Sequence, residues 1–96
     1  MSEKKHQAKH GKRRVTFSLE ASDAKGVQLI GDFNNWDSMK HPMRKDKSGI
    51  WKKIIYIYPG RYEYKFQVDR KWLIDPNGAQ ACMNCYGTYN SVIIVD

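Results

Sequence analysis

The chain has 96 residues, of which 41% are apolar, 12% aromatic and 28% charged, with a formal net charge of +7 at pH 7. This length is typical of one small globular domain and excludes a second one. A chain this short buries a small core and leaves little room for a deep cleft, so we expect a binding module rather than an enzyme. No apolar run reaches the roughly 18 residues that span a bilayer, and no signal-peptide pattern follows the basic start. We therefore expect a cytoplasmic protein with no membrane partner.

The positive charge is concentrated at the beginning of the chain. Residues 1–14 contain six lysines and arginines against one glutamate, whereas residues 15–96 are nearly balanced. Residues 1–13 have no large apolar side chain beyond Met1 to offset the entropy cost of ordering. We expect a disordered basic tail over residues 1–13 and a folded domain over residues 14–96. Contacts of the tail with phosphate or with an acidic partner would be salt-sensitive, and the near-neutral body disfavours a nucleic-acid partner.

Two strands are predicted in the first half of the domain. Apolar and polar residues alternate over residues 15–19, which is typical of a half-buried strand, and a second strand follows over residues 27–33. Residues 38–49 are polar and include Pro42, so we expect a loop that holds at most a short irregular strand. The core face of the two strands would comprise Val15, Phe17, Leu19, Val27, Leu29 and Phe33.

The second half continues the strand pattern. Residues 51–58 and 61–69 flank a Pro59-Gly60 turn, which predicts a β-hairpin. Lys65 would point to solvent from its second arm, opposite a core face made of Tyr62, Tyr64, Phe66 and Val68. A short strand over residues 72–74 and a buried closing strand over residues 91–95 follow, with no helix longer than about one turn. Six to eight short strands predict an all-β fold, an antiparallel sandwich.

The three tryptophans have different surroundings in the sequence. Trp51 opens an apolar strand and alternates with Ile55 and Ile57, so we expect it in the core or at its edge. Trp36 and Trp72 lie among polar and charged residues at strand ends, where an exposed ring marks a binding surface. From these residues alone, core packing and a binding face both stay open for Trp36 and Trp72.

Four motifs occur in one order along the chain: GDFNNW at 31–36, GRYEYKFQVD at 60–69, WLIDP at 72–76 and GTYNSV at 87–92. Together they resemble the glycogen-binding module of the AMP-activated protein kinase β subunit, which occurs in related form at the N-terminus of isoamylases and glycogen branching enzymes. The resemblance covers about residues 14–96. It implies an immunoglobulin-like antiparallel β-sandwich of the early-set type, and non-catalytic binding of α-1,4-linked glucan such as glycogen or starch.

The resemblance also assigns the sugar-contacting residues. It implies stacking of glucose rings on two tryptophans, a lysine contact, hydroxyl hydrogen bonds from a threonine and an asparagine, and an apolar wedge; these are Trp36, Trp72, Lys65, Thr88, Asn90 and Tyr86. Tyr86 stands where the kinase subunit has leucine, and Arg70 stands where glycine is usual before the second tryptophan. We expect these two departures to alter the preferred chain length or branching of the glucan. Asn90 also has a rival role, as the cap of a turn through its own backbone.

The two cysteines, Cys82 and Cys85, have the spacing of half a zinc site or of a redox pair. A structural zinc ion needs four ligands, and the chain has no second cysteine pair. A reactive pair needs a helix N-terminus, whereas we predict a loop over residues 82–85. We therefore expect incidental loop cysteines, no metal and no cofactor.

Catalysis is also not expected. Glycoside hydrolysis needs two carboxyl groups about 5 to 9.5 Å apart across a cleft. The candidate carboxylates, Asp32, Asp37, Asp69 and Asp75, all flank turns, where aspartate has an ordinary role as an Asx residue. The alternative to glucan binding is a protein-interaction or regulatory module of the same fold that packs on a separate catalytic protein, with the tryptophans as interface anchors.

Overall fold

The computed structural model describes residues 11–96, so the disorder expected for residues 1–10 of the tail lies outside the described residues. The strands are β1 (Arg13–Glu20), β2 (Val27–Gly31), β3 (Arg44–Lys45), β4 (Ile50–Ile57), β5 (Gly60–Val68), β6 (Lys71–Leu73), β7 (Gln80–Met83) and β8 (Tyr89–Val95). Within this range the single helical segment, the 3₁₀ turn η1 (Asp32–Asn34), is far too short to cross a membrane. Arg13, which was expected in the tail, lies in β1 and pairs with Ile57.

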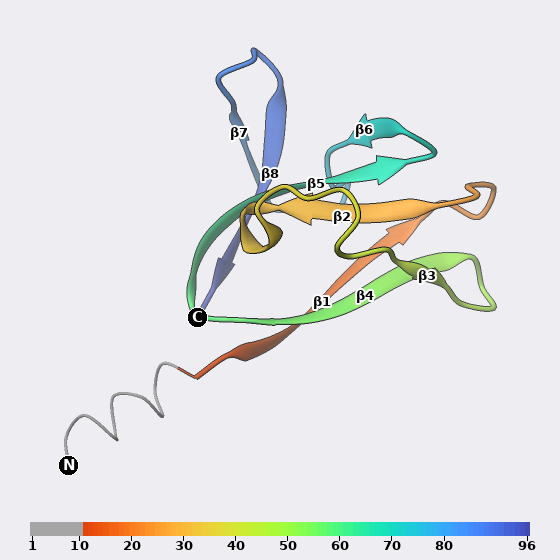
Figure 1. Cartoon of the computed structure of the whole chain (residues 1–96), viewed down its shortest axis with the longest axis horizontal. Helices are drawn as coiled ribbons and strands as arrows, with labels where there is room; N and C mark the ends of the chain where they lie inside the picture. The colour runs from red at the N-terminus through yellow and green to blue at the C-terminus, as the bar shows by residue number, and fades with distance from the viewer. Residues whose placement is uncertain (1–10) are drawn as a thin grey trace.

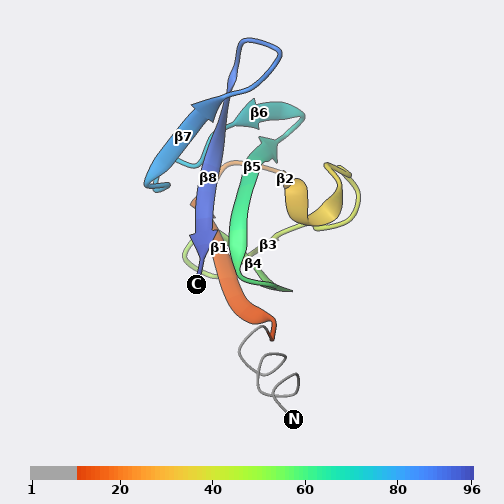
Figure 2. The same ribbon diagram turned by 90° about the vertical axis from the view of Figure 1, so that its left-hand side faces the viewer.

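The strands form two antiparallel sheets, which confirms the predicted sandwich. One sheet has the order β1-β4-β3 and the other has the order β2-β5-β8-β7, with β6 also paired to β5 (Figure 1). The view in Figure 2 shows β5 and β8 running side by side, with the η1 segment beyond β2. The nine-residue β5 is central because it pairs with β2, β6 and β8.

The predicted hairpin of residues 51–58 and 61–69 is wrong. β4 pairs with β1 and β3, whereas β5 belongs to the other sheet, so Pro59-Gly60 is a corner at which the chain changes sheets. Alternation predicts which side of a strand is buried. The same alternation results whether two strands pair within one sheet or lie in the two opposite sheets of a sandwich. The partner of each strand therefore depends on the tertiary structure, not on the local turn signal.

The core lies between the two sheets and contains the predicted inward faces. Phe17 packs against Tyr64 and Phe33, with ring centroids 5.0 and 5.4 Å apart. Trp51 is buried as predicted, and its indole N–H donates to the Ala21 carbonyl at 2.7 Å. Tyr62 and Val68 are only half-buried because they lie toward the two ends of β5.

The strand β7 was not predicted. Its residues Gln80–Met83 are mostly exposed, and none of them is β-branched. They therefore lack both the alternation and the residue types that predict a strand. They form a strand because they pair with β8, from Gln80↔Val92 to Met83↔Tyr89. Cys82 therefore lies in a strand, and of the predicted loop over residues 82–85 only the end with Cys85 lies in the β7–β8 turn.

Candidate functional site

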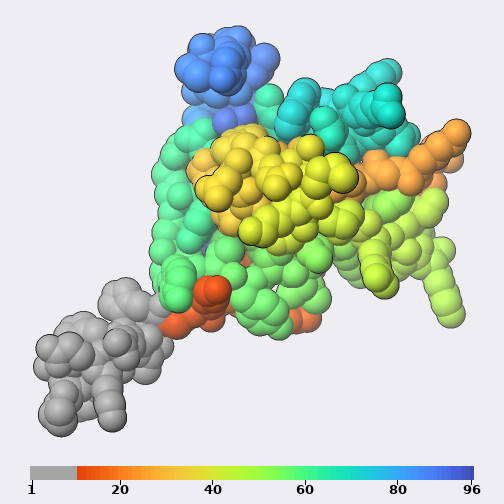
Figure 3. Space-filling view, in the orientation of Figure 1, coloured from red at the N-terminus to blue at the C-terminus, as the bar shows by residue number. Residues whose placement is uncertain are grey.

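An open groove of about 780 Å³ lies on the outer face of the five-stranded sheet. In Figure 3 the β7–β8 turn (blue), the β6 segment (cyan) and the η1 segment (yellow) rise around this hollow. All six residues predicted to contact sugar line it. The complete lining is Asp32, Trp36, Glu63, Lys65, Trp72, Asn84, Cys85, Tyr86, Thr88 and Asn90.

The first wall carries Trp36 on the segment Asp32–Asp37 that follows β2. Asn35 and Trp36 both have φ of 58°, a left-handed conformation that costs a non-glycine residue about 1 kcal/mol or more. The buried Asn34 holds this segment to the sheet: its Oδ1 accepts from the Gly31 N–H at 3.0 Å and its Nδ2 donates to the Leu29 carbonyl at 2.9 Å. The Trp36 ring is 37% exposed and is therefore available at the groove.

The second wall carries Trp72 on β6. The turn before it places Asp69 at φ 47° and Arg70 at φ 73°, so two consecutive residues have the positive φ of a type I′ turn. Arg70 adopts this conformation without glycine, and the Asp69 carboxylate supports the turn by accepting the Lys25 and Gly26 N–H groups, each at 2.9 Å. Trp72 is 53% exposed, and the Lys65 Nζ lies 5.7 Å from the centroid of its ring.

The third wall is the β7–β8 turn with Tyr86, whose side chain is 86% exposed. Asn84 holds this turn: its Oδ1 accepts the N–H groups of Tyr86 and Thr88 at 2.9 and 3.2 Å. The Thr88 Oγ1 accepts from Asn84 Nδ2 at 2.7 Å and from Lys65 Nζ at 3.1 Å, which brings the lysine on β5 to the foot of the turn.

Asn90 lies inside β8, not at a turn, so the turn-capping role does not apply to it. It is only 6% exposed. Its Nδ2 donates to Glu63 Oε1 at 3.0 Å and its Oδ1 accepts from Asn84 Nδ2 at 3.0 Å. Asn90 therefore belongs to the floor of the groove, below the more exposed Thr88 and Tyr86.

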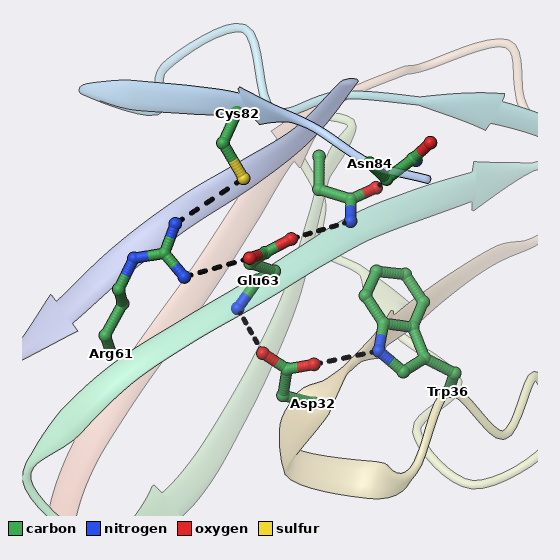
Figure 4. Close-up of polar contacts among 7 residues, drawn as sticks. Asp32, Trp36, Arg61, Glu63, Cys82 and Asn84 are labelled. Carbon is green, nitrogen blue, oxygen red and sulfur yellow. Dashed lines mark hydrogen bonds and ion pairs between the residues drawn. The ribbon is translucent and has the colours of Figure 1, made fainter. Parts of the chain in front are cut away.

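The sequence patterns did not indicate Asp32, Glu63 and Asn84 as groove residues. Asp32 accepts the Trp36 indole N–H at 2.9 Å and the Glu63 backbone N–H at 2.7 Å (Figure 4). Glu63 alternates onto the same face as Lys65, a signal that could have placed it in the site. Asn84 lies between the two cysteines, in a segment whose sequence carries no alternating pattern.

Each oxygen of the two carboxylates in the groove accepts a hydrogen bond from the protein. Asp32 uses its two oxygens for the indole and backbone N–H groups, and Glu63 uses Oε1 for Asn90 and Oε2 for Arg61 at 2.9 Å. These hydrogen bonds, first from Asn90 and then from Arg61, hold the pKa of Glu63 below its ordinary value of 4.5. A general acid needs the opposite shift, because it must keep its proton near neutral pH.

The other candidate groups have structural roles. Asp37 and Asp75 accept the N–H groups of Met39 and Asn77 at 2.8 and 2.9 Å, as Asx residues do. Asp32 instead bonds to the Trp36 indole and to β5, and Asp69 bonds to the distant Lys25 and Gly26. The Cys82 Sγ accepts from Arg61 Nη2 at 3.5 Å. Among residues 11–96, no group of three or more His, Cys, Asp or Glu side chains is arranged to hold a metal ion.

Exposed aromatic rings beside amide, hydroxyl and ammonium groups suit a ligand with apolar faces and a rim of hydroxyls, as a sugar has. The fold and the groove together define a β-sandwich of the carbohydrate-binding class. The family model of carbohydrate-binding module 48, the isoamylase N-terminal domain, matches residues 4–78, and the chain belongs to this family. The matched residues include Trp36, Lys65 and Trp72 and end before the β7–β8 turn. The finer resemblance to the kinase β subunit stays a prediction.

Individual relatives support the same family. The chain is 32% identical over 98 residues to protein PTST homolog 2, chloroplastic, of Arabidopsis thaliana, which covers 97% of this chain and 18% of the relative. It is 45% identical over 60 residues to the 1,4-alpha-glucan branching enzyme GlgB of Prochlorococcus marinus strain NATL2A, covering 59% of this chain and 8% of the enzyme. It is 40% identical over 60 residues to the 1,4-alpha-glucan branching enzyme GlgB of Myxococcus xanthus, and the match covers 62% of this chain and 8% of the enzyme. The chain thus spans less than a fifth of each of these relatives.

Proposed function

We propose that the domain binds α-1,4-linked glucan of the glycogen or starch type in this groove, without hydrolysing it. The observation that carries the proposal is the gathering of Trp36, Trp72 and Tyr86 around the polar groups of Lys65 and Thr88 in one open groove. The names of the branching-enzyme relatives give 1,4-α-glucan as what those enzymes act on, which supports the same ligand class.

The chemistry of the groove fits a helical glucan chain. The C–H face of a glucose ring carries weak positive charge and stacks on the negative π face of an indole. The ammonium group of Lys65 and the hydroxyl hydrogen of Thr88, whose oxygen already accepts from Asn84 and Lys65, then offer donors to the sugar hydroxyls. Each such bond contributes about 0.5–1.5 kcal/mol, so a short oligosaccharide would bind with Kd of about 10 μM to 1 mM. A polymer with many repeats would bind more tightly through avidity.

A non-catalytic role is supported by the state of the groove carboxylates. The four oxygens of Asp32 and Glu63 already accept hydrogen bonds from protein donors, and the pKa of Glu63 is lowered. Glu63 is therefore ionised at neutral pH and has no proton to give to a glycosidic oxygen.

The test is co-sedimentation with glycogen at moderate salt. The wild type should pellet, and the Trp36→Ala/Trp72→Ala double variant should stay in the supernatant. Tyr56→Ala is the matched control, because Tyr56 is an exposed aromatic residue on the other sheet. A wild type that stays in the supernatant, or a double variant that still pellets, would contradict the proposal.

A second candidate is docking of a separate, acidic protein on the outer face of the β1-β4-β3 sheet. This face exposes Ile54 and Tyr56 on β4 and Tyr58 just after it, and the Lys12 Nζ lies 5.4 Å from the Tyr58 ring centroid. Arg14 pairs with Tyr56 across the ladder, which adds a second cation. An apolar strip flanked by cations fits an apolar segment of a negatively charged partner.

The two candidates use different faces and can be separated. A cellular protein recovered with the wild type should be lost with Ile54→Lys/Tyr56→Lys and retained with Trp36→Ala/Trp72→Ala if the outer face is the docking surface. Loss with the tryptophan variant alone would instead make the groove the protein interface.

A further inference from the structure

We propose that Asp32 and Asn84 are positioning residues that hold two walls of the groove, and that Glu63 and Asn90 join them into one hydrogen-bonded network. The consequence for glucan affinity rests on the proposed function above. The network itself is a property of the free protein, because every one of its bonds is made between the chain's own side chains and backbone.

Asp32 fixes the wall that carries Trp36. Trp36 has a left-handed backbone, so its ring would reorient if the backbone relaxed to an ordinary conformation. The Asp32 carboxylate opposes this, because Oδ1 accepts the indole N–H at 2.9 Å while Oδ2 accepts the Glu63 N–H at 2.7 Å. β2 stops pairing with β5 at Gly31↔Tyr64, and the carboxylate supplies the next acceptor along β5. The ring is thereby tied to the sheet as well as to its own segment.

Asn84 fixes the wall that carries Tyr86. Its side chain makes four hydrogen bonds, to the N–H groups of Tyr86 and Thr88, to Thr88 Oγ1 and to Asn90 Oδ1. A side-chain amide has two donor hydrogens and two acceptor lone pairs, so this arrangement uses its full capacity. Asn84 has no hydrogen-bonding group left for a sugar, and its role is to shape the turn.

Glu63 and Asn90 connect the two walls. The path runs from the Trp36 ring through Asp32 to the backbone of Glu63, through the Glu63 side chain to Asn90, and from Asn90 to Asn84. Figure 4 shows Trp36 and Asn84 on either side of Glu63, with Arg61 holding its second oxygen. Asn90 is 6% exposed, so its bonds to Glu63 and Asn84 are partly shielded from water, which strengthens them. The two bonds of Asp32 lie at the exposed surface of the groove. A change at one wall should therefore be felt at the other.

Two nearly isosteric substitutions test this. Asp32→Asn turns one acceptor oxygen into an amino group that faces an N–H donor. Asn84→Asp keeps the oxygen that accepts the Tyr86 and Thr88 N–H groups and replaces the amino group by an oxygen that faces Asn90 Oδ1. Each variant should bind maltoheptaose about 5-fold more weakly, the effect of one hydrogen bond. Asp37→Asn, in the same segment but outside the groove lining, is the matched control and should bind like the wild type.

The double variant distinguishes a network from two separate supports. Independent effects would multiply to about 25-fold, whereas coupled walls should give about 10-fold or less, because the second substitution acts on a network already broken. A full multiplicative loss would overturn the coupling, and wild-type affinity in either single variant would overturn its positioning role.

A second readout needs no glucan, so it separates this proposal from the proposed function. In an amide NMR spectrum of the free protein, Asp32→Asn should shift the indole N–H resonance of Trp36, and Asn84→Asp should shift it too. The Trp51 indole N–H, bonded to the Ala21 carbonyl in the core, is the internal reference and should stay unchanged. An unmoved Trp36 resonance in Asp32→Asn would refute the anchor, even for a wild type that binds no glucan. Movement in Asp32→Asn but not in Asn84→Asp would refute the link between the walls.

Discussion

The Trp36 wall and the Tyr86 wall border the same groove but are held in different ways. The Trp36 segment rests on Asn34, which is 2% exposed and bonds into β2, whereas the Tyr86 turn is held by Asn84 within its own hairpin. In the first wall, a strained left-handed backbone at Asn35 and Trp36 sets the direction of the Trp36 ring. In the second wall, the 86% exposed Tyr86 lies at the tip of a turn. The comparison teaches that one groove can combine a rigid stacking platform with an adaptable cover.

The largest effect should come from Gly31→Ala, which attacks the rigid wall at its base. A Cβ at Gly31 would lie 2.6 Å from the Glu63 carbonyl oxygen and 2.6 Å from the Tyr64 Cβ, so β2 and β5 would have to move apart. We expect a loss of about 3 kcal/mol in the free energy of unfolding, measured by urea denaturation. Gly26→Ala is the control, because a Cβ there meets nothing within 4 Å. Equal stabilities of the two variants would show that the close approach is not needed.

The two aromatic walls should differ in their contribution to binding. Trp36→Ala should weaken maltoheptaose binding by about 10-fold or more, because it removes a ring that is already in place. Tyr86→Ala should cost only about 3-fold, since fixing the 86% exposed tyrosine side chain on binding offsets about 0.5–1.5 kcal/mol of its contact energy. Isothermal titration calorimetry measures both. The reverse order would make Tyr86 the principal platform.

The adaptable wall can be disturbed without touching the core. Gly87 has φ of 81°, and a Cβ there would enter open space. Gly87→Ala should therefore lower the free energy of unfolding only by the cost of a left-handed alanine, about 1 kcal/mol. We expect the thermal midpoint to fall by a few degrees. Gly87→Asn should recover part of the loss, because asparagine tolerates this conformation. A loss as large as that of Gly31→Ala would mean that the turn is packed, contrary to its exposure.

The smallest effect should be the change in the free energy of unfolding when acid protonates His41, which bonds to the Trp36 segment. Asn34 Nδ2 lies 2.8 Å from His41 Nδ1, so that nitrogen must accept and the ring must be neutral. Burial, followed by the charges of Lys53 and Lys40, lowers the pKa of His41 below 6.5. The stabilising contribution is therefore complete above pH 6.5 and is lost as the pH falls through the lowered pKa.

The loss should be about 0.5 kcal/mol, the low end for a half-buried hydrogen bond. It can be measured as the difference in unfolding free energy between pH 7.5 and pH 5.0, relative to His41→Gln. If the variant keeps the full pH dependence of the wild type, His41 is not the responsible group.

Much of the fold follows from local patterns. The alternation over residues 15–19 and 61–69 correctly predicts their core faces, and Trp51 is buried as its neighbours indicate. The strand predicted over 27–33 ends at Gly31, and Phe33 packs against the core from η1. Residues 80–83 carry no such pattern, because this edge strand is held by pairing with β8 and has no buried face of its own. Pairing is a property of two distant segments, so it leaves little trace in either one.

The sequence by itself determined most of the strands with their inward faces and, through four motifs, the family and six candidate contact residues. The tertiary structure alone decided that β4 and β5 lie in different sheets, that the six candidates meet in one groove, and that Asp32, Glu63 and Asn84 support them. The physical reason is the range of the interactions. The burial of alternate side chains can be predicted from neighbouring residues. A carboxylate that accepts a hydrogen bond from a different strand is placed only by the folding of the whole chain.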